Sequence, residues 1–381
     1  MGGPLEGVRV VELAGIGPGP YTCMLLADLG AEVVRIDRAT GSRPAPDAGP
    51  HWDLLVRSRR SVGVDLKSPD GVELVLDLVA RADALVEGWR PGVAERLGLG
   101  PDDCLARNPR LVYGRMTGWG QDGPLALRAG HDIDYIALSG ALWSIGRAGE
   151  PPVPPLNLVG DFGGGGMLLA FGIAAALVEA QRSGQGQVVD AAMVDGAASL
   201  MTMTHAMHHL GMWNDDRAAN MLDTGAPYYE VYETADGKWF AIGAIEPQFY
   251  AELVSVLGLQ GEKLPAQNDR SQWGAMKERF AAIFRTRTRD EWAAAFEGTD
   301  ACGAPVLSPW EAHEHPHNAV RETFVEVAGV RQPAPVPRFS RTAASISLPP
   351  SPSGLHADEV LGDWGVDEER IASLRKSGAI D

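Results

Sequence analysis

The sequence contains few cysteines and lacks an excess of positive charge. Its three cysteines, Cys23, Cys104 and Cys302, are far apart, which argues against a disulfide framework and against a paired CxxC metal site. We therefore expect a reducing, cytoplasmic setting and no metal. Acidic residues outnumber basic residues by 50 to 33, and the formal charge of −17 repels nucleic-acid phosphates. We expect no nucleic-acid partner.

Long apolar runs are also missing. The longest run, residues 167–178, is too short to cross a bilayer, and residues 1–6 lack the basic and apolar regions of a secretory signal. We therefore expect no membrane partner. What remains is a chain of 381 residues, 45% hydrophobic and 22% charged, which can bury a large core and exceeds one usual domain.

Strand-like and helix-like segments alternate in the first part of the chain. This order predicts an α/β fold whose large domain has a parallel, Rossmann-like sheet. The predicted strands are 8–13, 32–36, 84–86 and 111–116, and the predicted helices are 21–29 and 69–82.

A different pattern begins near residue 224. Residues 224–243 form two strand-like runs around Asp236-Gly237, which is a hairpin signature and predicts a smaller α+β domain with helices at 248–257 and 273–284. The Pro-rich stretch 333–352 is typical of an extended linker. The predicted organisation is a large domain at 1–190, linker helices at 191–224, a small domain at 225–325, and a return linker with a C-terminal segment packing on the large domain at 326–381.

The turn after the first strand imitates a dinucleotide-binding fingerprint. It is rich in glycine, and Asp37 follows about twenty residues later. However, Pro18 and Pro20 remove backbone N–H groups that would hold a pyrophosphate. We therefore expect no nicotinamide cofactor.

Cations crowd the following segment. Two interpretations stand: an anionic, phosphate-bearing ligand binds there, or the basic residues pair with acids elsewhere. The cations are Arg35, Arg38, Arg43, Arg57, Arg59, Arg60 and Lys67.

Two further motifs carry proton-transferring side chains. His131 lies in the polar run 129–135, and Asp161 precedes a run of glycines at the entry to an apolar helix. Alone, His131 would be an ordinary loop histidine and Asp161 an N-cap. Together at one cavity, an imidazole and a carboxylate would indicate acid/base catalysis.

Several separated motifs resemble the family III CoA-transferase superfamily over essentially the whole chain. Within it, the stretches 130–132, 157–161 and 243–248 resemble the α-methylacyl-CoA racemase branch. The wider resemblance rests on the stretches 10–15, 26–38, 64–67, 87–92, 97–100 and 118–124.

The resemblance implies one of two chemistries for Asp161. In the transferases the matching Asp is a nucleophile that forms a mixed anhydride, whereas in the racemases it carries a proton. His131 and Glu246 stand in racemase-like contexts, and residues 225–236 lack the glycine run that closes over the transferase site. We therefore expect a racemase of 2-methylacyl-CoA thioesters, in fatty acid metabolism, acting through an enolate, with a family III CoA transferase as the alternative.

The resemblance also implies the site. His131 with Glu246 would serve one face of the α-carbon and Asp161 the other, in an interlocked homodimer whose small domain completes the partner's site. No cofactor is expected beyond the CoA of the substrate. The residues implied to bind CoA are Arg38, Val64, Lys67, Glu87, Gly88, Arg90 and Arg96. Supporting roles fall to Ile16, Asp132, Tyr135, Asn157, Gly160 and Gly163.

Two features have competing interpretations. Backbone N–H groups of 160–163, at the start of the predicted helix, would stabilise an enolate oxygen, or the glycines would serve tight packing. His205 and His209 have the i, i+4 spacing of metal ligands, but the surrounding methionines favour a packed helix.

Overall fold

A computed structural model describes residues 2–39 and 53–381, and the chain divides into two compact units. The large unit comprises Met1–Ser139, Pro155–Leu200 and Val320–Asp381. The small unit comprises Gly140–Pro154 and Met201–Ala319. Each unit has its own hydrophobic core.

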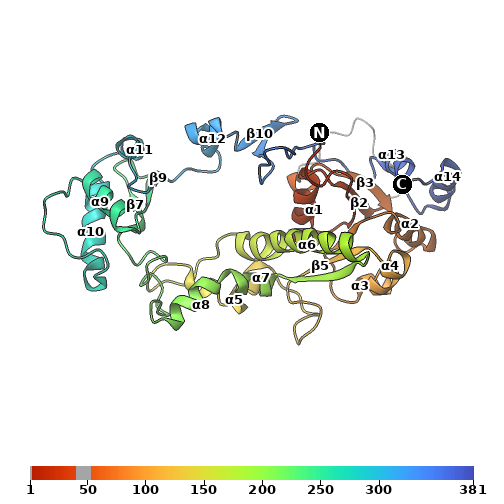
Figure 1. Cartoon of the computed structure of the whole chain (residues 1–381), viewed down its shortest axis with the longest axis horizontal. Helices are drawn as coiled ribbons and strands as arrows, with labels where there is room; N and C mark the ends of the chain where they lie inside the picture. Colours follow the sequence, from red (N-terminus) through yellow and green to blue (C-terminus); the bar gives the residue numbers. More distant parts are fainter. Residues whose placement is uncertain (1, 40–52) are drawn as a thin grey trace. The chain divides into compact units, whose positions relative to one another are not determined.

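A six-stranded parallel sheet organises the large unit, in the order β3-β2-β1-β4-β5-β6 (Figure 1). The chain builds outward from β1 to β3 and then returns to β4 on the other side of β1. Loops leaving β1 and β4 therefore diverge, which opens a crevice at the carboxyl ends of the strands. The predicted α/β, Rossmann-like fold is confirmed. Its strands are β1 (Arg9–Leu13), β2 (Glu32–Arg38), β3 (Arg60–Val64), β4 (Ala84–Glu87), β5 (Val112–Thr117) and β6 (Gln187–Ala192).

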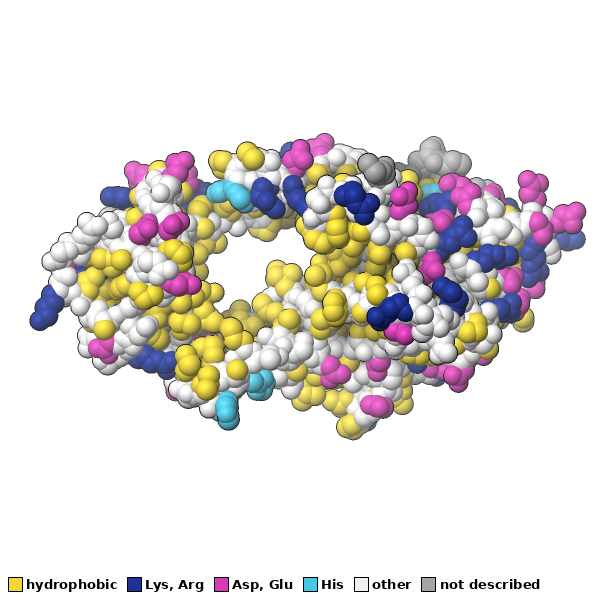
Figure 2. Space-filling model, in the orientation of Figure 1, with side chains coloured by type: hydrophobic (Ala, Val, Ile, Leu, Met, Phe, Trp, Pro, Cys, Tyr) yellow, Lys and Arg dark blue, Asp and Glu magenta, His cyan; other side chains and the backbone are white. Residues whose placement is uncertain are grey.

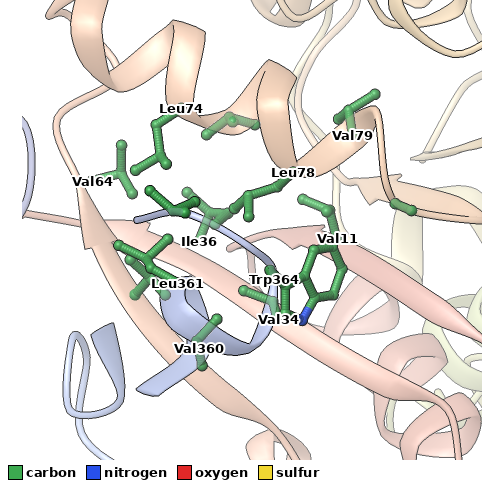
Figure 3. Packing of buried hydrophobic residues seen from close by; sticks show 14 of the residues in the cluster. Val11, Val34, Ile36, Val64, Leu74, Leu78, Val79, Val360, Leu361 and Trp364 are labelled. Carbon is green, nitrogen blue, oxygen red and sulfur yellow. The ribbon is translucent and has the colours of Figure 1, made fainter. Parts of the chain in front are cut away.

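Alternating side chains of the strands fill a core on each face of this sheet. Val11 of β1 belongs to one cluster with Leu78 and Trp364 (Figure 3), whereas its neighbour Val10 belongs to the other cluster with Leu26. Two buried faces explain the nearly continuous apolar strands that the sequence shows. The helices of this unit are α1 (Pro18–Asp28), α2 (Pro69–Val79), α3 (Val93–Arg96), α4 (Pro101–Arg107), α5 (Asp132–Leu138), α6 (Leu168–Ser183), α7 (Met193–Leu200), α13 (Ala357–Asp363) and α14 (Glu368–Ser377), with a 3-10 turn at Leu54–Val56.

One helix of the large unit is unusually long and apolar. A π-helical segment, η3 (Leu158–Met167), runs directly into α6, so the continuous helix spans Leu158–Ser183. Its length and composition would suffice to cross a membrane, a test that core helices also pass, and less than half of its most apolar stretch is buried. Phe171 is 72% exposed and Val178 is 56% exposed. Hydrophobic side chains gather on the visible face around α6 (Figure 2).

The small unit contains the predicted hairpin. Strands β7 (Tyr229–Glu233) and β8 (Trp239–Gly243) pair antiparallel, and β9 (Gly303–Pro305) adds to β8. Gly237 has a φ of 71°, a left-handed conformation that glycine adopts without strain, and it closes the turn. The helices that contribute to this unit are α8 (Thr202–His209), α9 (Pro247–Val256), α10 (Trp273–Phe284), α11 (Arg289–Phe296) and α12 (Pro316–Val320), with 3-10 turns at Leu142–Ser144, Arg270–Gln272 and Ala312–Glu314.

Carboxylates pair with most of the basic segment. Arg57 Nη2 lies 2.6 Å from Asp28 Oδ2, and Arg59 Nη1 lies 2.6 Å from Glu12 Oε2, with both pairs buried. Arg35 pairs with Asp37, and Arg60 pairs with Asp363. Of the two interpretations, pairing with acids holds for these four arginines, while Arg43 lies outside the described residues.

Residues of this basic segment also fasten the C-terminal part of the chain. Arg57 Nη1 donates to the carbonyl of Pro333 at 2.8 Å, and the amide of Gly354 donates to Ser61 Oγ at 2.8 Å. The hairpin β10 (Phe324–Val327) and β11 (Val330–Pro333) begins this segment, and most of the Pro-rich stretch after it is irregular. Ion pairs and hydrogen bonds hold a segment with little secondary structure against the sheet.

Candidate active site

A cavity of about 350 Å³ opens in the large unit at the carboxyl ends of β1, β4, β5 and β6. It lies at the switch point between β1 and β4, where the fold leaves a crevice. Residues from four strand ends, from α5 and from η3 line it together. They are Ile16, Gly17, Pro18, Gly88, Trp89, Arg90, Met116, Thr117, Gly118, Trp119, Ala126, Arg128, Ala129, Gly130, His131, Tyr135, Asp161 and Met193.

His131 lies at the N-cap of α5 and its side chain is on the cavity wall. Its backbone N–H donates to Asp134 Oδ2 at 2.9 Å, and the amide of Asp134 donates back to the carbonyl of His131 at 2.9 Å. These two bonds satisfy backbone groups at the start of the helix. They fix the backbone of His131 at the start of α5, beside the cavity.

Asp161 reaches the same cavity from η3 and is half-buried. Burial raises the pKa of its carboxyl group, the negative charge of Asp132 also raises it, and His131 lowers it. Asn157 Nδ2 donates to Asp161 Oδ2 at 3.1 Å and opposes the rise in pKa. A carboxyl group with a raised pKa exchanges a proton more readily near neutral pH.

Packing accounts for the glycines that follow. A Cβ at Gly164 would lie 2.6 Å from the amide nitrogen of Ala197, and one at Gly166 would lie 2.9 Å from the carbonyl oxygen of Pro18. The helix begins at Leu158, two residues before the predicted start at Gly160. The amide of Asp161 already donates to Asp132 Oδ1, so it is not free to bind an enolate oxygen. Of the two interpretations of the run, tight packing fits the structure better.

Aromatic rings form another part of the wall. Trp119 and Tyr135 pack edge to face with centroids 4.8 Å apart, and a Cβ at Gly118 or Gly130 would collide with the Tyr135 ring. Burial, followed by the charge of Asp161, raises the pKa of the Tyr135 hydroxyl to about 12. The hydroxyl therefore stays protonated and able to donate at neutral pH.

The sequence and the fold agree with comparisons to known proteins. The family model for CoA-transferase family III matches residues 5–357. The chain belongs to CoA-transferase family III. It is 48% identical to the mouse protein named alpha-methylacyl-CoA racemase, over 99% of this chain and 97% of the mouse protein. The human protein of that name is 46% identical, with the same coverage.

More distant relatives share the family and the fold. A succinyl-CoA–D-citramalate CoA-transferase from Chloroflexus aurantiacus is 30% identical over 99% of this chain and 98% of its own. A crystal structure of a CAIB/BAIF family protein from Brucella suis superposes with a TM-score of 0.80 at 25% identity, covering 96% of this chain and all of that one. The crystal structure of Rv3272 from Mycobacterium tuberculosis gives 0.77 at 27% identity, over 94% and 99% of the two chains.

The residues that the family resemblance assigns to CoA fall into two groups. Gly88 and Arg90 line the cavity. Five others do not: Arg38, Lys67 and Arg96 are exposed near the ends of β2, β3 and α3, while Val64 and Glu87 are buried at the ends of their strands. Their contacts with CoA stay predictions.

Hydrogen bonds within the protein hold the carboxylate of Glu87 in place. Its Oε1 accepts from Arg115 Nε at 2.8 Å, and its Oε2 accepts from the amide of Trp89 at 2.7 Å. Each carboxylate oxygen of the buried Glu87 therefore already accepts a hydrogen bond from within the protein.

Glu246 belongs to the small unit. It is exposed at the N-cap of α9, followed by Pro247 in the first turn of the helix. Its pairing with His131 stays a prediction.

Among the supporting residues, Ile16 and Tyr135 line the cavity, Asn157 and Asp132 hydrogen-bond Asp161, and Gly160 packs against Asp132. A Cβ at Gly163 would lie 3.0 Å from the carbonyl oxygen of Leu158, inside η3.

Sequence reasoning missed several cavity residues. Arg128 lies just before the motif of His131 and contributes a cation to the wall, and Met193, the first residue of α7, directly follows β6. The position of Arg128, directly beside a polar motif, could have indicated it.

His205 and His209 lie on α8, and residues 2–39 and 53–381 contain no group of three or more His, Cys, Asp or Glu side chains arranged to hold a metal.

Proposed function

We propose that this member of CoA-transferase family III is an isomerase that inverts the α-carbon of 2-methylacyl-CoA thioesters. The supporting observation is that His131 and Asp161 line one cavity at the carboxyl ends of the sheet strands. The relatives named as racemases are also closer in sequence, at 46–48% identity, than the transferase from Chloroflexus aurantiacus at 30%.

Inversion requires one group to remove the α-proton and a second group to return a proton to the opposite face. In this proposal, His131 serves one face and Asp161 the other. The raised pKa of Asp161 brings a carboxyl group closer to the range in which an imidazole titrates, so the two can alternate as acid and base. The neutral hydroxyl of Tyr135 can donate a hydrogen bond to the oxygen on which the enolate charge develops.

No other reactant is needed for this step. The α-proton passes to one carrier, the enolate holds the electron pair, and the other carrier supplies a proton, so the thioester is conserved. We propose that catalysis requires neither metal nor cofactor beyond the CoA of the substrate. Activity retained after dialysis against EDTA would support this part of the proposal, and activity that returns only with added metal would contradict it.

Purified protein incubated with (2R)-2-methylacyl-CoA in D2O, without an acceptor acid, tests the proposal. A racemase incorporates α-deuterium and loses optical purity, both of which NMR follows. A transferase instead needs a free acid and uses Asp161 as a nucleophile. Hydroxylamine during turnover would then modify Asp161, and that result would assign the chain to the alternative chemistry.

We also propose that the protein acts as a homodimer. The support is the apolar outer face of α6, where Phe171 is 72% exposed, because monomeric soluble proteins rarely expose large contiguous apolar patches. In this proposal Glu246 of a second copy orients His131, as the family resemblance implies. Sedimentation at micromolar concentration should give the mass of a dimer, and a monomer would contradict it.

Subunit mixing tests whether Glu246 acts across the dimer. His131→Ala and Glu246→Ala proteins should each be nearly inactive. If Glu246 acts in trans, a mixed dimer has one site with both defects and one intact site, and re-equilibrated equal mixtures regain about one quarter of wild-type activity. If Glu246 acts within its own chain, every site keeps a defect and the mixture stays inactive.

A further inference from the structure

His131 and Asp161 lie on separate elements of the large unit, and Asp132 connects them. His131 is the N-cap of α5, and Asp132 is the first residue of that helix. Asp132 Oδ1 accepts the backbone N–H of Asp161 at 2.7 Å. One side chain thus joins the start of α5 to η3 at the residue that carries the carboxyl group.

The contact between these elements is close and buried. Asp132 is 7% exposed. A Cβ at Gly160 would lie 2.4 Å from Asp132 Oδ1 and 2.8 Å from its Cγ, so the absence of a side chain at Gly160 is what lets Asp132 reach the Asp161 amide. Its position therefore follows from local sterics as well as from the hydrogen bond.

The second carboxylate oxygen of Asp132, Oδ2, does not take part in the contact between α5 and η3. Among the residues that the structure describes, Oδ2 is buried and has no hydrogen-bond partner. An unpaired buried carboxylate oxygen costs free energy, and packing alone would be served better by a neutral residue. The acidic residue at this position therefore has a purpose other than stability.

We propose that Asp132 is a positioning residue that fixes the separation of His131 and Asp161 across the substrate's α-carbon. This inference rests on the proposed function, because it assigns the two carriers to opposite faces of that carbon. A displacement of about 1 Å in a reacting group can lower a rate about a hundredfold, so one hydrogen bond at this place can control turnover.

The charge of Asp132 supplies a second effect. Asp132 raises the pKa of the Asp161 carboxyl group, after burial and against the hydrogen bond from Asn157. Four polar or titratable groups face Asp161. Asn157 comes from the N-cap of η3, the element that carries Asp161, and the others, His131, Asp132 and Tyr135, come from α5 and its N-cap. Removing the charge of Asp132 would lower the pKa of Asp161.

Two substitutions separate these effects. Asp132→Asn keeps an oxygen that accepts the Asp161 amide but removes the charge, whereas Asp132→Ala removes both. For Asp132→Ala we expect kcat to fall about a hundredfold with KM changed less than about threefold. For Asp132→Asn we expect a smaller loss of kcat, with the limb of the pH–rate profile that belongs to Asp161 moved to lower pH. Asp102→Asn, an exposed acid in the first turn of α4, is the matched control and should change neither quantity.

Amide hydrogen exchange gives a readout that does not depend on activity. The Asp161 amide should exchange slowly in the wild type and in Asp132→Asn, and faster in Asp132→Ala. Unchanged exchange in Asp132→Ala, an unaltered pH profile in Asp132→Asn, or a loss in Asp132→Ala that falls equally on kcat, CoA binding and thermal stability would each overturn the inference. A wild-type protein that shows no α-proton exchange would instead reject the proposed function, while the amide measurement would still decide whether Asp132 holds Asp161.

Discussion

Buried carboxylates occur in two settings in the large unit, and only one of them suits proton transfer. Burial raises the pKa of Asp28 at the end of α1, of Glu12 in β1 and of Asp161 in the cavity. Arg57 contacts Asp28 and Arg59 contacts Glu12, whereas the Asp161 carboxylate accepts a hydrogen bond from the neutral amide of Asn157 and lies near His131. A permanent cation holds the charge of the first two in place, while Asp161 is left free to gain and lose a proton.

The largest effect should come from removing the proton carrier. Asp161→Asn keeps the size and the hydrogen-bonding atoms of the side chain but cannot accept the α-proton. We expect kcat for racemisation to fall about a thousandfold, within the range of general acid–base catalysis. The circular dichroism spectrum should match that of the wild type, and the thermal midpoint should be no lower. If the variant kept activity within tenfold of the wild type, Asp161 would be no more important for catalysis than the carboxylates paired with arginine, and it would not be a proton carrier.

Breaking a paired carboxylate should damage stability instead. Asp28→Asn leaves the guanidinium of Arg57 buried without its counter-ion, so we expect the free energy of unfolding to fall by about 3–5 kcal/mol in urea titrations. The activity of each folded molecule should persist. Glu73→Gln, in the exposed pair with Arg107, serves as control and should cost less than about 1 kcal/mol. Equal costs for Asp28 and Glu73 would contradict the distinction between the two settings.

Arginines of the large unit also occur in these two settings, in the cavity and in buried ion pairs. Arg90 lines the cavity, whereas Arg57 and Arg59 are buried in ion pairs with Asp28 and Glu12. We expect Arg90→Ala to raise KM for the acyl-CoA about tenfold, the size of one lost charge-assisted hydrogen bond, with little change in stability. Arg110→Ala, an exposed cation outside the cavity, should leave KM unchanged. Equal KM values for the two variants would show that Arg90 does not bind the substrate.

The smallest effect concerns stability as a function of pH. Because the folded-state pKa of Asp161 lies above its unfolded value, the folded protein favours the protonated form, and ionisation of Asp161 lowers stability as pH rises through this range. Asp161→Asn should therefore be slightly more stable than the wild type at pH 7, by less than the loss at Asp28→Asn. The difference should disappear below the unfolded pKa near 3.8, which urea titrations at the two pH values can measure.

Local patterns were enough to predict most of the fold. Apolar strands such as Val112–Thr117, the helix Trp273–Phe284 and the Asp236-Gly237 hairpin follow from periodicity and turn chemistry. Pro18 and Pro20 fit the first turn of α1, where a missing N–H costs nothing. The start of η3 at Leu158 differs from the predicted helix start because packing of the glycines, not local propensity, sets this segment.

The candidate site was predictable only in part. His131 and Asp161 were recognisable from their motifs, and both reach one cavity. The bond from the Asp161 amide to Asp132 joins residues 29 apart in the chain, and the pairing of Arg57 with Asp28 joins residues equally distant. Such contacts depend on how the elements pack, so charge and spacing in the sequence do not reveal them.

The most direct test of the two-carrier mechanism is enantiomer-resolved exchange in D2O. Wild-type protein should incorporate α-deuterium into both (2R)- and (2S)-2-methylacyl-CoA. His131→Ala should retain exchange with only one enantiomer, and Asp161→Asn should retain exchange with only the other, because each variant keeps the base for one face. Loss of exchange with the same enantiomer in both variants, or full exchange with both enantiomers in either variant, would contradict the assignment of His131 and Asp161 to opposite faces.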